Sequence, residues 1–329
     1  NILRFEQDFP GAKVIKLEQN YRSTPDILGA ASGLIDANSQ RLGKTLWTER
    51  NGGDKVRVVG VWDGPEEARR IGEEAERLER EGASLATVAI LVRAQFQTRE
   101  FEDRFIAIGL PYKIIGGFRF YERAEIRDAL AYLRLIHQPA DDLAFERIIN
   151  VPKRGIGDSS VKKMHEHARA RGLSLYGAAG EMAHGEGIPG KARSSLRELL
   201  ESFTRWRQQL DGLTHVELAE MILEESGYTA MWQNDKSQQA HARLENLKEL
   251  VQSMAAFDTL EAYLEHVSLV MDLDKEAGED AVQIMTLHSA KGLEFDAVFI
   301  TGLEEGLFPH ENSLSDRAGL EEERRLMYV

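Results

Sequence analysis

The sequence predicts an α/β fold in which a largely parallel sheet is interrupted by a mostly α-helical insertion. Short apolar, β-branched segments alternate with helical patterns in the first third of the chain, which is typical of a parallel sheet with helices on its faces. From about residue 122 to residue 278 the strand pattern is absent, and it resumes only near the end of the sequence. One interrupted sheet fits this order better than two domains in tandem, because an isolated pair of strands could not bury both of its faces.

Six segments have the composition of buried strands, since they are short, apolar and rich in Val and Ile. They are residues 14–17, 56–62, 88–92, 112–115, 282–287 and 297–301. Between the early strands, helices are predicted at residues 25–38, 65–81 and 98–108. The first helix has Ser23 or Thr24 as its N-cap and Pro25 in its first turn, which is a favourable helix start.

The helical insertion contains three long helical patterns, at residues 192–210, 216–226 and 240–257. A length of 329 residues is sufficient for two domains, because a single core usually stops growing near about 250 to 300 residues. We therefore expect residues 1–118 and 279–329 to form the sheet domain and residues 119–278 to form the insertion.

The composition limits the chemistry available to the chain. There is no cysteine, which excludes disulfides, cysteine-bound zinc and thiol catalysis from these residues. The nine histidines are scattered, and neighbours such as His165 and His167 would point to different sides of a helix, so no metal site is expected. No apolar run is long enough to span a bilayer and no signal peptide is recognisable. The expected location is therefore cytoplasmic, without a membrane partner.

The charge is strongly acidic overall but basic in one segment. A net charge of −14 argues against coating nucleic acid through the overall field. Between residues 147 and 171, however, seven basic residues stand against two acidic ones, a local net charge of +5. This basic segment is either a solvated helix face or a local site for an anion.

Tyr21 and Arg22 stand immediately before the first predicted helix. A planar ring beside a guanidinium offers base stacking and phosphate pairing, which a nucleotide site requires, although such pairs also occur at ordinary surfaces. A complete Walker A motif is absent. Gly43, Lys44 and Thr45 resemble its end, but the required glycine five positions earlier is replaced by Asn38.

A second candidate segment follows the strand at residues 282–287. Residues 288–292 read His-Ser-Ala-Lys-Gly, and small, hydroxyl and basic residues at the end of a parallel strand are suited to contact a ligand. A plain turn from strand to helix, with Gly292 as its flexible point, is the alternative.

Six segments in a fixed order give the chain a family resemblance. They are residues 19–24, 91–93, 116–126, 285–295, 302–310 and 321–329. Through them nearly the whole chain resembles the UvrD/PcrA/Rep family of superfamily-one DNA helicases. The resemblance begins after the family's Walker A and Walker B motifs and ends before its Thr-Arg-Ala. It implies a second RecA-like motor domain, P-loop NTPase-like but without its own Walker A, carrying a helical insertion domain and separated from the first motor domain.

The resemblance implies that ATP with Mg binds between the two motor domains. Tyr21 would stack on adenine, Arg22 would be the catalytic arginine finger at the γ-phosphate, and Glu294 would hold the ribose. The missing first motor domain would be a partner and would supply the Mg ligands, so this chain alone is expected to be inactive. Arg324 and Arg325 are expected to be structural or interface residues.

Single-stranded DNA is a further partner that the resemblance implies. The matching positions are Arg93, Gln95, Thr286, His288 and His310. Gln95 stands where the family usually has Asn. Without the resemblance, His310 would be interpreted as a turn residue after Pro309.

Duplex DNA is the partner implied for the insertion. Residues 149–157 and the helix that follows resemble the family's Gly-Ile-Gly hairpin, a helix-hairpin-helix-like element that grips the duplex backbone. The matching positions are Lys153, Arg154, Gly155 and Gly157. Glycines allow close approach to a phosphate, and amides at a helix start donate to it without reading sequence. A solvated helix start is the alternative.

An ATP-dependent DNA helicase or translocase that unwinds duplex DNA in repair or replication is the function that the resemblance implies for the parent protein. Two alternatives remain open. One is a non-catalytic DNA-binding or regulatory module that keeps the fold. The other is the motor arm of a helicase-nuclease, which would require a nuclease domain with clustered acidic metal ligands.

Overall fold

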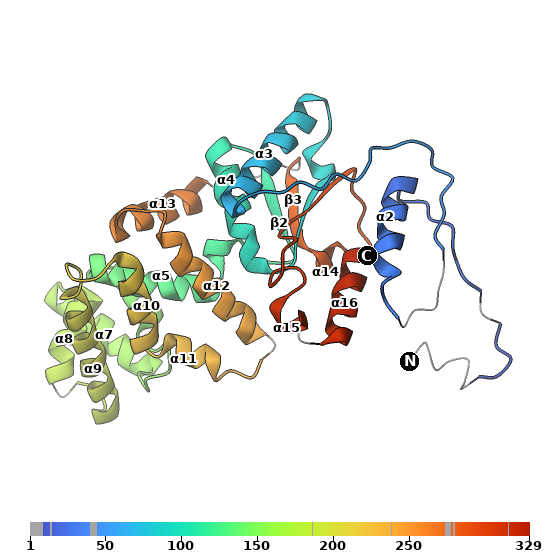
Figure 1. Ribbon diagram of the computed structural model, residues 1–329. Coiled ribbons are helices and arrows are strands. Elements are labelled where there is room, and N and C mark those ends of the chain that lie inside the picture. The colour runs from blue at the N-terminus through green and yellow to red at the C-terminus, as the bar shows by residue number, and fades with distance from the viewer. Residues whose placement is uncertain are drawn as a thin grey trace. The chain divides into compact units, whose positions relative to one another are not determined.

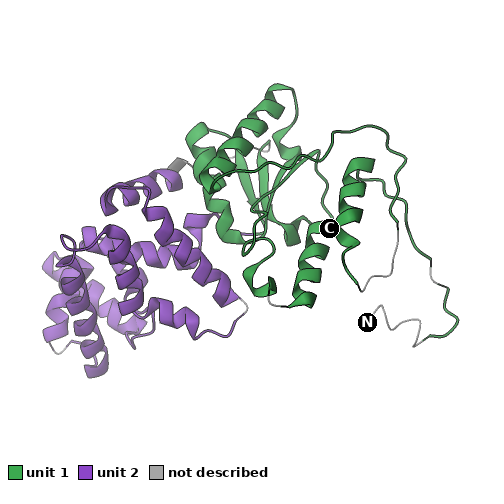
Figure 2. Cartoon of the chain, viewed as in Figure 1, with its two compact units in different colours: residues 1–116, 278–329 green, residues 117–277 purple. Residues whose placement is uncertain are grey.

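The chain divides into a unit that contains a sheet and a unit of helices. The computed structural model describes residues 9–13, 15–39, 45–185, 187–237, 239–273, 278, 280–314 and 316–329. Unit 1 comprises Asn1–Gly116 and Gly278–Val329, and unit 2 comprises Gly117–Ala277 (Figure 2). The domain limits expected from the sequence, at residues 118/119 and 278/279, lie beside these boundaries.

Unit 1 is built on a four-stranded parallel sheet. Its strands are β1 (Val88–Val92), β2 (Tyr112–Ile115), β3 (Val282–Thr286) and β4 (Ala297–Ile300). Their order is β2-β3-β1-β4, and all three neighbouring pairs are parallel. Because β3 lies between β1 and β2, residues from before and after unit 2 share one sheet. The predicted α/β class with an inserted helical region is therefore confirmed.

Helices cover both faces of this sheet (Figure 1). The helices of unit 1 are α2 (Pro25–Ile35), α3 (Gly64–Arg80), α4 (Thr98–Ile108), α14 (Leu287–Ala290), α15 (Glu311–Leu314) and α16 (Arg317–Tyr328). Alternate residues of β1 enter different cores, as the period of two in a strand requires. Ile90 packs in one core with Phe101 and Phe105 of α4. Leu91 packs in the other with Phe308, beside Leu326 of α16.

Unit 2 consists of helices around an aromatic core. Its helices are α5 (Ala124–His137), α6 (Asp142–Ile148), α7 (Asp158–Arg171), α8 (Leu175–His184), α9 (Gly190–Arg207), α10 (His215–Glu225), α11 (Tyr228–Gln233), α12 (Gln239–Met254) and α13 (Leu260–Leu273). Tyr132 of α5 stacks on Phe203 of α9 with ring centroids 6.1 Å apart, and Trp206 meets Phe203 edge-on at 5.1 Å. None of the helices in the described part of the chain is long and apolar enough to cross a membrane.

Two of the six predicted strands are wrong. Residues 15–17 and 56–62 contain no strand, and Leu17 and Val58 are 81% and 89% exposed. Their β-branched composition gave the prediction, but a strand also requires a partner for its backbone hydrogen bonds. The backbone pairing near the first segment is an isolated bridge between Gln19 and Trp47. Val14, which begins the first predicted strand, lies outside the described residues. Gly43 and Lys44, which resemble the end of a Walker A motif, also lie outside them.

Phe105 is the aromatic centre of the core between α4 and the sheet. It is fully buried and lies 6.0 Å from Tyr112 and 6.4 Å from Phe101 between ring centroids. We predict that Phe105→Ala lowers the free energy of unfolding by about 3–5 kcal/mol, because it removes apolar contacts and leaves a cavity. Urea denaturation measures this loss. Phe118→Ala is the control, since Phe118 is 71% exposed and its removal should cost no more than about 0.5 kcal/mol.

Candidate functional site

The turn that carries Tyr21 and Arg22 is fixed by its neighbours. Asn20 Oδ1 accepts hydrogen bonds from the backbone amides of Arg22 at 2.9 Å and Ser23 at 2.8 Å. The amide of Asn20 donates to the carbonyl of Trp47, and Arg50 Nη1 donates to the carbonyl of Arg22 at 2.7 Å. This local network holds the turn before α2.

Arg22 and Glu294 meet in space although 272 positions separate them. Arg22 Nε donates to Glu294 Oε1 at 3.1 Å, and the two side chains are 43% and 70% exposed. Within the described residues, the two Nη nitrogens of Arg22 make no hydrogen bond. Tyr21 is 74% exposed, and its hydroxyl donates to Gln19 Oε1. An exposed ring, spare guanidinium donors and a carboxylate fit the base, phosphate and ribose of a nucleotide.

The candidate single-strand contacts begin where two neighbouring strands end. Val92, the last residue of β1, pairs with Thr286, the last residue of β3. Arg93 follows Val92 directly, so it lies beside the end of β3. The Thr286 hydroxyl accepts a hydrogen bond from the amide of Ser289 at 3.3 Å, which makes it the N-cap of α14. Gln95 and His288 are exposed at this edge.

Arg93 and His310 are joined by one carboxylate of α16. Arg93 donates to Glu323 through Nε at 2.9 Å and Nη2 at 2.8 Å, and the amide of His310 donates to Glu323 Oε2 at 3.2 Å. Burial raises the pKa of Glu323, but hydrogen bonding and the charge of Arg93 outweigh it and hold that pKa below its usual value. The structure thus brings Arg93 and His310 to one place.

The loop before α7 presents most of its predicted contact residues to solvent. Lys153, Gly155 and Gly157 are exposed, and Gly155 has a φ of +73°, which favours glycine. A Cβ at either glycine would meet no atom within 4 Å, so the space beside this backbone is open. Gly157 is the N-cap of α7 and has no side chain to satisfy the first amides of the helix.

Arg154 has a different environment from Lys153. Its guanidinium donates to the carbonyls of Ile148 at 2.9 Å and Ser226 at 3.2 Å, and to the Tyr132 hydroxyl at 2.6 Å. These contacts anchor the loop to the body of unit 2. Arg154 is therefore placed to shape the loop, and both of its Nη nitrogens are already engaged.

The basic segment is partly neutralised by acidic residues from outside it. Arg147 pairs with Asp128 at 2.6 Å, and Arg171 pairs with Glu181 at 3.3 Å. Burial raises the pKa of Asp128, and the charge of Arg147 opposes this rise. The local excess of positive charge counted in the sequence is thus smaller in the folded unit.

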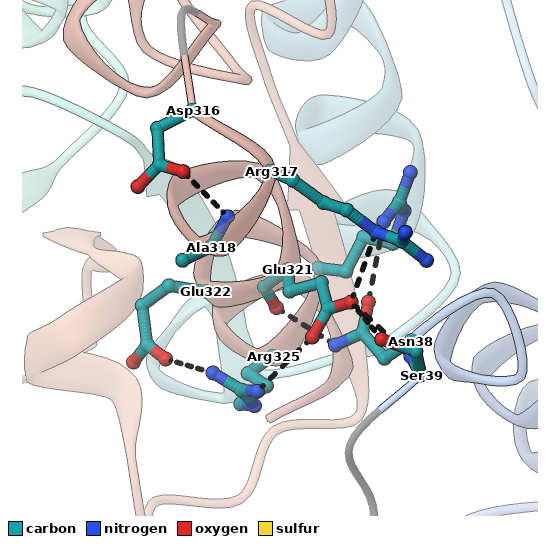
Figure 3. Close-up of polar contacts among 9 residues, drawn as sticks. Asn38, Ser39, Asp316, Arg317, Ala318, Glu321, Glu322 and Arg325 are labelled. Atoms are coloured by element: carbon teal, nitrogen blue, oxygen red, sulfur yellow. Dashed lines mark hydrogen bonds and ion pairs between the residues drawn. The ribbon is translucent and has the colours of Figure 1, made fainter.

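A polar junction joins the end of α2 to α16 (Figure 3). The buried Glu321 carboxylate accepts hydrogen bonds from Ser39 through its hydroxyl at 2.7 Å and its amide at 3.2 Å. Asn38 Nδ2 donates to the carbonyl of Glu321, and Arg324 Nη1 donates to Asn38 Oδ1. Arg325 pairs with Glu321 and with Glu322. Arg324 and Arg325 thus make contacts within unit 1, as structural residues would.

Sequence reasoning missed several residues that build these sites. Asn20 had a local signal, because an asparagine before a turn often bonds to amides two and three positions later. Glu321 and Glu323 lie in a segment that carries the resemblance, but no local signal gave their roles, since their partners lie at distant positions. Among the described residues, no group of three or more His, Asp or Glu side chains is placed to hold a metal ion.

The fold defines an α/β domain that has polar and charged side chains at the ends of its parallel strands and carries a helical insertion. The chain belongs to the UvrD-like helicase C-terminal domain family, whose model matches residues 15–329. Over all of its length, it is 49% identical to the probable DNA helicase II homolog of Rickettsia felis and covers 51% of it. It is 43% identical to DNA helicase II of Escherichia coli, covering 47% of that protein.

A third relative is the ATP-dependent DNA helicase PcrA of Bacillus subtilis. It is 43% identical over the whole of this chain, and the chain covers 46% of its length. The chain therefore spans about half the length of the curated relatives it matches.

The junction of α2 and α16 predicts a pH-dependent stability. Hydrogen bonds from the side chain and backbone of Ser39 lower the pKa of Glu321 from its usual 4.5. A lowered carboxyl pKa stabilises the fold above pH 4.5, and this contribution is lost as the pH falls through the folded-state pKa. We predict that Glu321→Gln lowers the urea midpoint at pH 7 and that the midpoints of the two proteins converge as the pH falls through the folded-state pKa of Glu321.

The control for this prediction is the neighbouring carboxylate. Glu322 is 71% exposed in its side chain and pairs with Arg325, so Glu322→Gln should change the midpoint much less at either pH. Equal effects of the two substitutions would contradict the role of Glu321.

Proposed function

We propose that this chain is the part of an ATP-dependent DNA helicase that supplies contacts to ATP across a domain interface and contacts to DNA. The exposed Arg22–Glu294 pair, with spare donors on Arg22, is the observation that carries the proposal. The printed names of the relatives, DNA helicase II and ATP-dependent DNA helicase PcrA, support it. In this proposal the phosphate loop and the Mg ligands belong to a first motor domain outside these residues. The proposed location of the protein is the cytoplasm.

In this proposal the exposed turn contacts the nucleotide. Tyr21 stacks on the base, Glu294 binds the ribose hydroxyls, and Arg22 exchanges its carboxylate partner for the γ-phosphate. A guanidinium there stabilises the charge that develops on the transferring phosphoryl group. ATP, bound with Mg, would be the substrate, and transfer of its γ-phosphoryl group from ADP to water would drive movement.

DNA contacts are assigned to the other two sites. Single-stranded DNA lies at the strand-end edge that carries Arg93, Gln95, Thr286, His288 and His310. Duplex DNA lies on the loop before α7, where Lys153 supplies charge and the open backbone at Gly155 and Gly157 approaches the phosphates. Arg154 holds that loop in shape.

The first test addresses ATP turnover by the full-length protein. We predict that Arg22→Ala lowers kcat by about a thousandfold or more, because it removes charge stabilisation in the transition state. Arg22→Lys should not restore the rate, since an ammonium lacks the planar fork of a guanidinium. Steady-state phosphate release measures both variants.

Arg57→Ala is the matched control, because Arg57 is 71% exposed and pairs with Glu74. Full ATP turnover by Arg22→Ala would refute the assignment and would favour a non-catalytic DNA-binding module.

The second test separates the two basic residues of the loop. We predict that Lys153→Ala weakens binding to forked DNA and lowers the slope of log K against log salt by about one, because one phosphate contact is lost. Arg154→Ala should weaken binding without that change in slope, since it loosens the loop. Fluorescence anisotropy at several salt concentrations measures both.

Lys248→Ala removes the same charge elsewhere in unit 2, where Lys248 is 69% exposed, and should leave fork binding unchanged. Unaltered binding by Lys153→Ala at low salt would contradict the duplex contact.

A further inference from the structure

Glu323 is a buried carboxylate that binds two other segments of unit 1. It lies on α16 with 6% of its surface exposed. Its oxygens accept hydrogen bonds from Arg93 after β1, from the amide of His310, and from the Ser313 hydroxyl of α15 at 3.3 Å. Burying a carboxylate is costly unless it is paired and hydrogen-bonded, and here the donors come from two distant parts of the chain, Arg93 and the turn at residues 310–313.

The pairing geometry fixes the orientation of Arg93. Nε and Nη2 both donate to the same carboxylate, a side-on arrangement that permits little rotation of the guanidinium. Within the described residues, Nη1 of Arg93 makes no hydrogen bond. Arg93 is 20% exposed in its side chain, so a fixed donor remains at the strand-end edge for an outside acceptor.

We propose that Glu323 is a positioning residue for single-stranded DNA: it sets the direction of the Arg93 guanidinium and the backbone turn at His310 before DNA binds. This inference rests on the proposed function, in which Arg93 contacts the strand. Glu323 itself does not touch DNA. Its contribution is to order a long, flexible side chain in advance, which removes an entropy cost from binding.

Simple electrostatics predicts the opposite effect. Removing a negative charge beside a phosphate-binding edge should strengthen DNA binding, because phosphate affinity follows positive charge. A positioning role predicts that the same substitution weakens binding. The sign of the change in affinity therefore separates the two accounts.

The experiment is a double-mutant cycle in the full-length protein, with fluorescein-labelled oligothymidine as the probe. Arg93→Ala should weaken binding by about tenfold, as expected for one charged hydrogen-bonding group. Glu323→Gln should also weaken binding, by several-fold, and the loss in the double variant should be smaller than the sum of the two single losses, with any loss beyond that of Arg93→Ala acting through the turn at His310. Glu322→Gln, which removes the same charge from the exposed side of α16, should leave binding unchanged or strengthen it.

The outcomes distinguish this inference from the proposed function. Unchanged binding by Arg93→Ala would overturn the assignment of Arg93 to DNA, and with it the inference. Weaker binding by Arg93→Ala, together with unchanged or tighter binding by Glu323→Gln, would overturn the positioning role alone. Additive losses would do the same. If circular dichroism shows that Glu323→Gln does not fold, Glu323→Asp takes its place. Its loss of DNA affinity must then be non-additive with that of Arg93→Ala in the same way.

Discussion

The pairing of β3 with both β1 and β2 is the constraint on which the rest of unit 1 depends. β3 follows the whole of unit 2 in sequence. Its two neighbours in the sheet, β1 and β2, both precede unit 2, and β3 forms backbone hydrogen bonds with each of them. This register sets Thr286 beside the end of β1 and so creates the edge that carries Arg93. It also starts the segment that leads through α14 to Glu294, the partner of Arg22. Both candidate sites of unit 1 follow from one set of parallel hydrogen bonds.

Two carboxylates of α16 bind other segments of unit 1. Glu321 binds Ser39 in the segment after α2, and Glu323 binds the segment after β1 together with the turn at His310. Residues two apart on a helix point to different sides, so one helix can hold two segments at once. A buried carboxylate that loses its partner is left uncompensated at large cost. These contacts therefore specify one arrangement of the segments.

Local patterns allowed part of this structure to be predicted from the sequence. The four real strands and the helices between them were evident from β-branched runs, caps and periodicity, whereas residues 15–17 and 56–62 had the same composition but found no partner strand. Arg22 was a candidate from its place beside Tyr21, and Glu294 was a candidate from the resemblance alone. Glu323 could not be identified, because its ion pair with Arg93 spans 230 positions. The contacts of Arg154 could not be predicted either, because its positive charge is evident from the sequence but the carbonyls that accept its hydrogen bonds are not.

Arg22 and Arg93 differ in how firmly each is held, and this difference suits different tasks. The Arg22–Glu294 pair is exposed on both sides, and exposed pairs typically contribute only about 0–1 kcal/mol. Arg22 can therefore leave Glu294 for a stronger anion at small cost. Arg93 is fixed by two hydrogen bonds to a buried carboxylate, so releasing it would leave that charge unpaired. In the proposed function, a contact that is made and broken with each ATP requires the first property, and a fixed donor to a DNA strand requires the second.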